Sequence, residues 1–150
     1  MFGKKRLGVV IMICIAMVLS LTNPIMAIDQ ADTGSAAESN ISVMPMMVYI
    51  NSISTAMYIE GYGVTTAAGR ISAYSSTTDE VWIFLYLERY VNGSWVTYAS
   101  WSEIFNTYHG YLEGTKVVPH GYYYRVRGSY YAWSGSNYEH VTGYSSVQYY

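Results

Sequence analysis

The amino-acid sequence predicts an all-β protein in which two antiparallel sheets pack face to face as a β-sandwich of about seven or eight strands. From residue 46 onward, short stretches rich in Val, Ile, Thr, Tyr and Trp alternate with Gly, Asn and Ser. Such stretches are typical of strands separated by turns. No segment in this part keeps the apolar spacing of an amphipathic helix over three turns, so no helix is expected.

The first 27 residues have the pattern of a signal peptide. A basic segment of Lys4, Lys5 and Arg6 precedes an apolar run over residues 7–21. That run is shorter than the roughly 20 apolar residues of a membrane-spanning helix, and Ala27 supplies the small residue that a cleavage site needs. We therefore expect cleavage near Ala27 and a secreted, extracellular protein. An uncleaved N-terminal anchor is the alternative.

Net charge and cysteine content limit which classes of partner and which cellular compartment are expected for this protein. Residues 28–150 keep five basic and all ten acidic side chains, and this net charge of −5 argues against nucleic acid and, once the signal is removed, against anionic membranes. Cys14 is the only cysteine and lies in the apolar run. The secreted part can therefore contain neither a disulfide nor a thiolate nucleophile. Export without disulfides suits a Gram-positive bacterium.

The chain after the signal divides into a spacer and one domain. Residues 28–45 are small, polar and aperiodic, which predicts a flexible spacer. Residues 46–150 form a single β-sandwich domain, large enough to bury a core without disulfides. The strands expected in it are 46–51, 54–60, 64–74, 80–91, 94–101, 114–118, 121–133 and 138–147.

The clearest unit is the segment EVWIFLYLERYVNGSWVTYASW, in which Asn92 and Gly93 separate two β-prone runs. Asn-Gly is the strongest signal for a tight β-hairpin, because both central residues of the turn need a positive φ. One face of the hairpin would then carry aromatic rings stacked across the two strands. The pairs expected across it are Tyr90 with Trp95, Glu88 with Thr97, Tyr86 with Ala99, and Phe84 with Trp101.

Alternation along each strand separates an inner face from an outer one. On the 80–91 strand, the aliphatic residues Val81, Ile83, Leu85 and Leu87 are expected to face the main core, because the other face carries Glu88. A strand covered on both faces is the alternative. On the 121–133 strand the uncharged set is expected to face inward: Tyr122, Tyr124, Val126, Gly128, Tyr130 and Ala132.

A turn at Pro119-His120-Gly121 leads into the 121–133 strand. In immunoglobulin-like sandwiches, a tyrosine just after such a corner reaches back with its hydroxyl to a backbone group. Tyr122 or Tyr124 is the candidate for this contact.

The segments VWIFLYLERYVNGSWVTYASWS, VVPHGYYYRVRGSYYAW and EHVTGYSS together resemble those of small secreted β-sandwich proteins of Gram-positive bacteria that are classed as a domain of unknown function. The resemblance covers about residues 46–147. It implies an immunoglobulin-like or fibronectin-like sandwich that is exported and has no established activity. It transfers no catalytic residue.

Residues that could carry chemistry are few and scattered. His109, His120 and His140 have no metal-binding or catalytic spacing, although folding could bring His120 near Glu113 or His140 near Glu139. The carboxylates are dispersed, and no Gly-x-Ser-x-Gly elbow is present. The sequence therefore predicts no enzyme activity, no cofactor and no metal site.

Aromatic content is the unusual feature, because all 18 tyrosines and all four tryptophans lie in residues 28–150. In an immunoglobulin-like order the 121–133 strand pairs with the 80–91 strand, so the outward residues of both would form one face. The candidate ligand-binding residues on this face are Trp82, Phe84, Tyr86, Tyr90, Trp95, Trp101, Tyr123, Arg125, Arg127, Tyr131 and Trp133.

This aromatic face has two interpretations. Sugar rings stack on aromatic planes, and Tyr, Trp and Arg anchor protein interfaces, which predicts a non-enzymatic protein that binds an extracellular glycan or another protein. Alternatively, the rings form a second layer covered by their own loops and by arginine stems. A secreted bacteriocin-like antagonist and a structural or self-assembling surface protein are the other roles left open.

Overall fold

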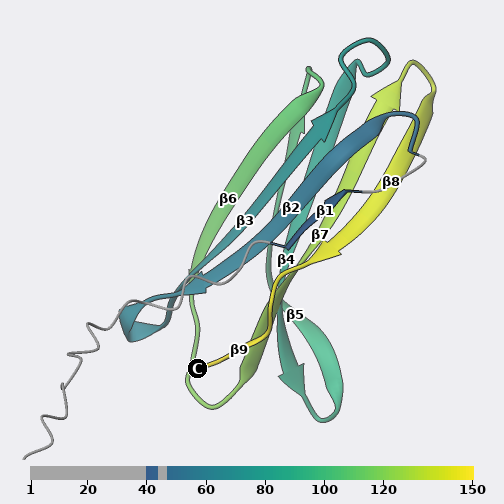
Figure 1. The fold of residues 1–150 in the computed structure, drawn as a ribbon. Helices are drawn as coiled ribbons and strands as arrows, with labels where there is room; N and C mark the ends of the chain where they lie inside the picture. The colour runs from purple at the N-terminus through teal and green to yellow at the C-terminus, as the bar shows by residue number, and fades with distance from the viewer. Residues whose placement is uncertain (1–39, 44–46) are drawn as a thin grey trace, which may run out of the picture. The chain divides into compact units, whose positions relative to one another are not determined.

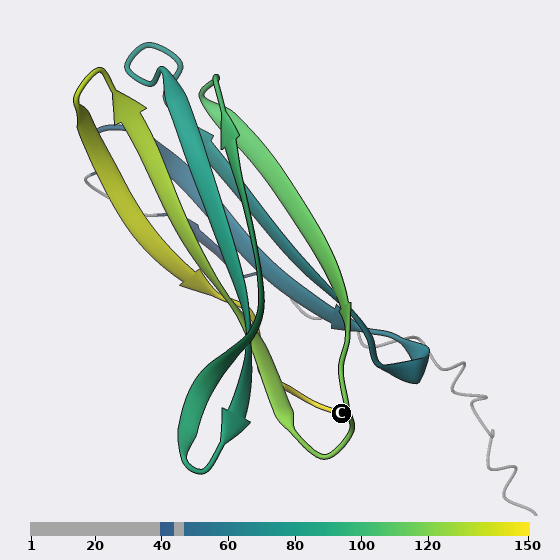
Figure 2. The same cartoon turned by 180° about the vertical axis from the view of Figure 1, so that it is seen from behind.

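The computed structural model describes residues 40–43 and 47–150. Within them, nine strands form two antiparallel sheets that lie as two layers (Figure 1), seen from the opposite side in Figure 2. The predicted two-sheet antiparallel β-sandwich is confirmed. The predicted signal peptide and residues 28–39, 44 and 45 of the predicted spacer lie outside the described residues.

Sheet A has the strand order β1-β2-β3-β6, and sheet B has the order β5-β4-β7-β8, with β9 paired to the start of β7. The position of β7 between β4 and β8 is that of strand F between strands C and G in immunoglobulin-like sandwiches. A 3₁₀ turn, η1 (Gly61–Gly63), joins β2 to β3. The strand bounds are β1 (Asn40–Val43), β2 (Ile50–Ile59), β3 (Val64–Ala73), β4 (Glu80–Val91), β5 (Ser94–Phe105), β6 (His109–Val117), β7 (Tyr123–Ser134), β8 (Asn137–Tyr144) and β9 (Gln148–Tyr149).

Several strands differ in extent from those predicted. Residues 50–51 and 54–59, which were expected in two separate strands, belong to one strand, β2, which continues through a register shift between Ile50 and Ser52. Strand β5 runs on to Phe105, and β6 begins at His109, earlier than residue 114. Residues 40–43 were expected in the flexible spacer, but they form β1, because they pair with the edge of β2.

The core lies between the two sheets and is built from the faces that the alternation predicts. The aliphatic residues of β4 that point toward sheet A are fully buried, and so are four residues of β7. Burying a large apolar side chain contributes about 1.5–3 kcal/mol to stability. These residues are Val81, Ile83, Leu85 and Leu87 on β4, and Tyr124, Val126, Tyr130 and Ala132 on β7.

Tyr130 crosses this core from sheet B to sheet A. Its hydroxyl lies 2.7 Å from Thr55 Oγ1 and donates a hydrogen bond of 2.9 Å to the backbone oxygen of Ser54. Gly69 and Gly128 leave room for the ring, because a methyl group on either would overlap its hydroxyl end. Burial raises the pKa of Tyr130 to about 12, against the opposing effect of the Thr55 hydrogen bond.

The β4–β5 hairpin has the predicted turn but not the predicted register throughout. Asn92 and Gly93 have φ values of 51° and 84°, as the favoured two-residue turn requires. The predicted pairs Tyr90–Trp95 and Glu88–Thr97 are present. Beyond them a β-bulge places Leu87 opposite Ala99, so Tyr98 has no residue directly opposite it.

The bulge overturns the prediction that Trp101 belongs to the aromatic face. Because side chains alternate along a strand, one extra residue moves every later side chain of β5 to the other face. Trp101 therefore lies opposite Leu85 instead of Phe84 and packs against the core. Gly114 of sheet A accommodates it, because a methyl group there would overlap the indole ring. The predicted pair of Tyr86 with Ala99 is wrong for the same reason.

Two sets of hydrogen bonds connect the beginnings of strands to other parts of the domain. The Tyr124 hydroxyl donates a hydrogen bond of 2.8 Å to the backbone oxygen of Pro119, so Tyr124 is the corner tyrosine. The Glu139 carboxylate of β8 accepts three backbone hydrogen bonds at the start of β2, from Val48, Tyr49 and Ile50, at 2.6 to 2.9 Å. Glu139 thus joins sheet B to sheet A.

Candidate functional site

The outer face of sheet B is built by the pairing of β4 with β7. In the β4–β7 register, each outward residue of β4 lies opposite an outward residue of β7. The side chains of β8 continue the same face, because β8 pairs with the other edge of β7. We call this surface the aromatic face. The β4–β7 pairs on it are Trp82 with Tyr131, Phe84 with Ser129, Tyr86 with Arg127, and Glu88 with Arg125.

One half of the aromatic face is a cluster of rings in mutual contact. The Trp82 ring lies 4.8 Å from that of Trp133 and 6.3 Å from that of Phe84, measured between centroids. The Tyr131 ring meets Phe84 edge-on at 5.9 Å, and Tyr138 lies 4.6 Å from Trp133. Such contacts hold each ring in a fixed orientation. We call these five residues the Trp82 cluster.

The centre of the aromatic face holds an ion-paired group of one carboxylate and two arginines, and the sequence did not reveal this pairing. Glu88 accepts hydrogen bonds from Arg125 Nε at 2.8 Å and from Arg127 Nε at 2.7 Å, and its side chain is only 7% exposed. The Arg125 guanidinium also lies 4.3 Å from the centroid of Trp95, and that of Arg127 lies 4.1 Å from the centroid of Tyr86. Both arginines are therefore held over rings by one shared carboxylate.

The other half of the face, near the hairpin turn, is bordered by tyrosines. The Tyr90 ring lies 5.2 Å from that of Trp95, and Tyr144 lies 4.6 Å from the guanidinium of Arg125. Tyr123 of β7 contacts Tyr149 of β9, with the centroids 5.0 Å apart. The short strand β9 thus extends the aromatic face beyond the end of β8.

The predicted contact residues on the aromatic face fall into two groups, exposed and half-buried. Tyr90 and Tyr123 are exposed, the latter 52%. Three exposed tyrosines that were not among the predicted contact residues lie on the same face: Tyr138, Tyr144 and Tyr149. Alternation along the predicted 138–147 strand would have indicated Tyr138 and Tyr144, whereas Tyr149 lies in β9, which was not predicted. Eight predicted residues lie on the face and are half-buried: Trp82, Phe84, Tyr86, Trp95, Arg125, Arg127, Tyr131 and Trp133.

Two donors on this face have no acceptor. The indole Nε1 atoms of Trp82 and Trp133 are both buried and lack a hydrogen-bond partner among the described residues. Leaving such a donor unpaired costs about 1–3 kcal/mol. The two tryptophans therefore carry hydrogen-bonding capacity that the described protein does not use.

The histidines hold structural contacts. His140 Nε2 lies 2.7 Å from Ser129 Oγ, a contact between β8 and β7 that the sequence reading missed. His120 stacks on Tyr150 at 3.8 Å. Among the described residues, no group of three or more His, Cys, Asp or Glu side chains is placed to hold a metal ion.

No family model, curated protein or solved structure matches this chain. The fold class therefore rests on the strand order of the two sheets, and the candidate site rests on the contacts of its own residues. Within the part of the chain that the structure describes, no helix has the length and apolar character needed to cross a membrane.

Proposed function

We propose that this chain is an exported, non-enzymatic binding protein whose aromatic face docks on an extracellular protein. The observation that carries the proposal is the composition of the face: exposed tyrosines border half-buried tryptophans and two fixed arginines. Tyr, Trp and Arg are the residues that dominate binding energy in protein interfaces. Lysine, which interfaces disfavour, is absent from this face, since Lys116 of sheet A is the only lysine after residue 27.

Preorganisation of the face supports the same proposal. Binding normally costs about 0.5–1.5 kcal/mol for each long side chain that it immobilises. Arg125 and Arg127 are already held by Glu88, and the rings of the Trp82 cluster already hold one another. A partner would therefore meet side chains that have lost most of their freedom on folding.

The experiment compares capture of extracellular proteins by the immobilised chain and by two variants. The face variant combines Tyr90→Ser, Tyr123→Ser and Tyr138→Ser, which remove exposed rings. The control variant is Tyr74→Ser, which removes an exposed ring from the turn after β3. We expect a captured protein whose affinity falls at least about tenfold in the face variant and is unchanged in the control.

A glycan array with the same three proteins separates the two classes of ligand. If the unchanged chain binds a glycan and the face variant does not, the ligand of the aromatic face is a carbohydrate and not a protein. Equal binding by the face variant and the unchanged chain would contradict the proposal for either ligand.

Export, the Gram-positive source and the resemblance to secreted sandwich proteins stay predictions. Mass spectrometry of the N-terminus of the protein recovered from culture medium tests the cleavage expected near Ala27. Inhibition of related strains by the purified protein would favour the bacteriocin-like role. Concentration-dependent oligomers would favour self-assembly.

A further inference from the structure

The outer face of sheet A differs from the aromatic face, because small side chains form its centre. In the sheet A register, Ala56 of β2, Ala68 of β3 and Glu113 of β6 lie side by side in one row. The next row on one side contains Tyr58, and the next row on the other side contains Tyr111. Two short alanine side chains thus lie between two rows with large rings.

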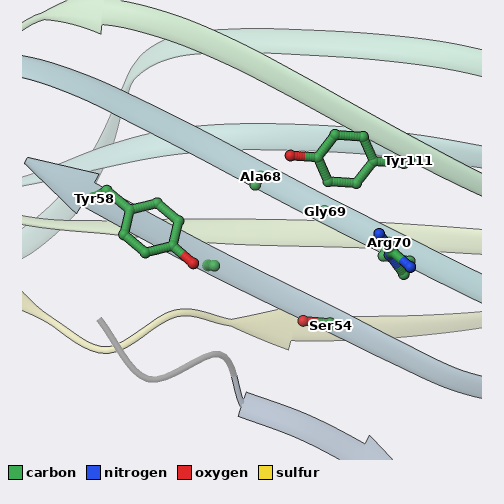
Figure 3. A pocket seen from close by; sticks show the side chains of 7 residues that line it. Ser54, Tyr58, Ala68, Gly69, Arg70 and Tyr111 are labelled. Carbon is green, nitrogen blue, oxygen red and sulfur yellow. The ribbon is translucent and has the colours of Figure 1, made fainter. Parts of the chain in front are cut away.

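These rows enclose a pocket with a volume of about 340 Å³. Figure 3 shows the rings of Tyr58 and Tyr111 on opposite sides of the Ala68–Gly69 stretch of β3, with Arg70 farther along that strand. Alanine forms the floor and tyrosines form the walls. We call this pocket the sheet A trough. Its volume lies at the lower end of the range for pockets that hold small ligands.

Arg70 gives the trough a positive charge. Its guanidinium lies 5.4 Å from the centroid of Tyr111 and has no carboxylate partner in the described part of the chain, whereas Arg125 and Arg127 share Glu88. The nearby Glu113 accepts a hydrogen bond from the Tyr111 hydroxyl and forms no ion pair with Arg70. In a protein with net negative charge, Arg70 is therefore a local cation available to an anionic group.

A second hollow of about 320 Å³ continues beyond Arg70 and Tyr111, toward Ser72 and His109. Arg70 and Tyr111 line both hollows. Both spaces border β3 and β6, and the trough also borders β2. A ligand with more than one ring could therefore occupy both, with Arg70 at the junction.

We propose that the sheet A trough binds a short acidic oligosaccharide, with a sugar ring lying between Tyr58 and Tyr111 and its carboxylate on Arg70. The apolar C–H face of a sugar packs on tyrosine rings, and small alanines let the ring approach the sheet. The carboxylate forms a two-pronged, charge-assisted pair with a guanidinium. The Tyr58 hydroxyl can bind a sugar hydroxyl group at the edge of the ring.

This site is separate from the aromatic face and does not depend on the proposed protein partner. The trough lies on β2, β3 and β6, whereas the aromatic face lies on β4, β5, β7, β8 and β9. Substitutions in the trough therefore test the acidic sugar alone.

The test is calorimetric titration of the purified chain with disaccharides that contain glucuronate, galacturonate, N-acetylneuraminate or N-acetylmuramate. Each is paired with its carboxyl-reduced counterpart, which has the same ring without the charge. We expect at least one acidic sugar to bind about tenfold more tightly than its reduced form. Arg70→Gln should abolish that preference, and Tyr58→Ser should weaken binding of both forms about tenfold.

Each control variant makes the same type of substitution at a position outside the trough. Lys116→Gln removes a positive charge elsewhere on β6, and Tyr74→Ser removes an exposed ring outside the trough; both should bind as the unchanged chain does. Thermal unfolding checks that every variant is folded. If Arg70→Gln is unfolded, Arg70→Lys replaces it and should keep only part of the preference. The proposal is overturned if no acidic sugar binds, if the reduced forms bind equally well, or if the preference survives substitution of Arg70.

Discussion

The Tyr124 hydroxyl donates a hydrogen bond of 2.8 Å to the backbone oxygen of Pro119. The ring of Tyr124 is fully buried, so this bond connects the core to the corner through which the chain enters β7. Two outward residues of the aromatic face, Tyr123 and Arg125, flank Tyr124 in the chain. The contact therefore positions the start of the aromatic face as well as stabilising the fold.

We expect Tyr124→Phe to lower the free energy of unfolding by about 1 kcal/mol, because it removes this hydrogen bond and leaves the packing intact. Tyr123→Phe is the matched control, since the neighbouring Tyr123 is exposed and should change stability by less than about 0.5 kcal/mol. Urea denaturation of both variants measures the difference. Equal stabilities would show that the corner bond contributes nothing.

Stability should fall at alkaline pH because of Tyr130. Its pKa is raised to about 12 by burial, so the folded state keeps a proton that the unfolded state releases at a pKa near about 10. The contribution is complete below the unfolded pKa and is lost as the pH rises toward 12. Tyr130→Phe should remove this loss and lower stability at pH 8 by about 1–3 kcal/mol. A wild-type alkaline slope in Tyr130→Phe would contradict the assignment.

Stability should also fall at acidic pH because of Glu139. Burial alone would raise the pKa of this carboxyl, but hydrogen bonds from the backbone of Ile50, Val48 and Tyr49 outweigh it and lower the pKa. The contribution is therefore present above the unfolded pKa of about 4.3 and is lost as the pH falls through the lower folded pKa. Solvent screens this partly exposed group.

Glu139→Gln should lower stability at pH 7 by about 1 kcal/mol and flatten the acid limb of the stability curve. Glu103→Gln, at an exposed position of β5, serves as the control. The stabilities of both variants are compared by denaturation midpoints measured between about pH 2 and 7, the range in which carboxyl groups titrate. An unchanged acid limb in Glu139→Gln would exclude this carboxylate as its origin.

The contact of Trp101 with Gly114 should make glycine necessary at position 114. Gly114→Ala places a methyl group where the indole ring lies and should cost about 2 kcal/mol, because the ring must move within a packed core. Gly61→Ala meets no atom within 4 Å and should change stability by less than about 0.5 kcal/mol. Thermal unfolding of the two variants tests this, and a stable Gly114→Ala would place Trp101 outside the core.

Local patterns in the sequence predicted the parts of the fold that depend on neighbouring residues. The Asn92-Gly93 turn followed from the need for positive φ, and the inner faces of β4 and β7 followed from alternation. The bulge at Tyr98 could not be predicted, because alternation along a strand does not indicate where an extra residue is inserted; in the folded protein Trp101 then faces Gly114 of the other sheet. Such a contact between distant strands has no local signature.

The candidate site was predictable to a similar degree. The aromatic residues of β4 and β7 could be placed on one face, because the order of the strands follows from the sandwich class. The role of Glu88 could not, since it depends on two arginines 37 and 39 residues away. The sheet A trough could not be predicted from the sequence either, because Ala56 and Ala68 indicate a pocket only when large rings are known to lie beside them.

Oxidative footprinting of tyrosine rings, with and without the captured partner, tests the central claim most directly. If the aromatic face is the binding surface, Tyr90, Tyr123, Tyr138, Tyr144 and Tyr149 should become protected in the complex, while the exposed Tyr62 and Tyr74 stay reactive. Unchanged reactivity of the five face tyrosines in a saturated complex would contradict the claim.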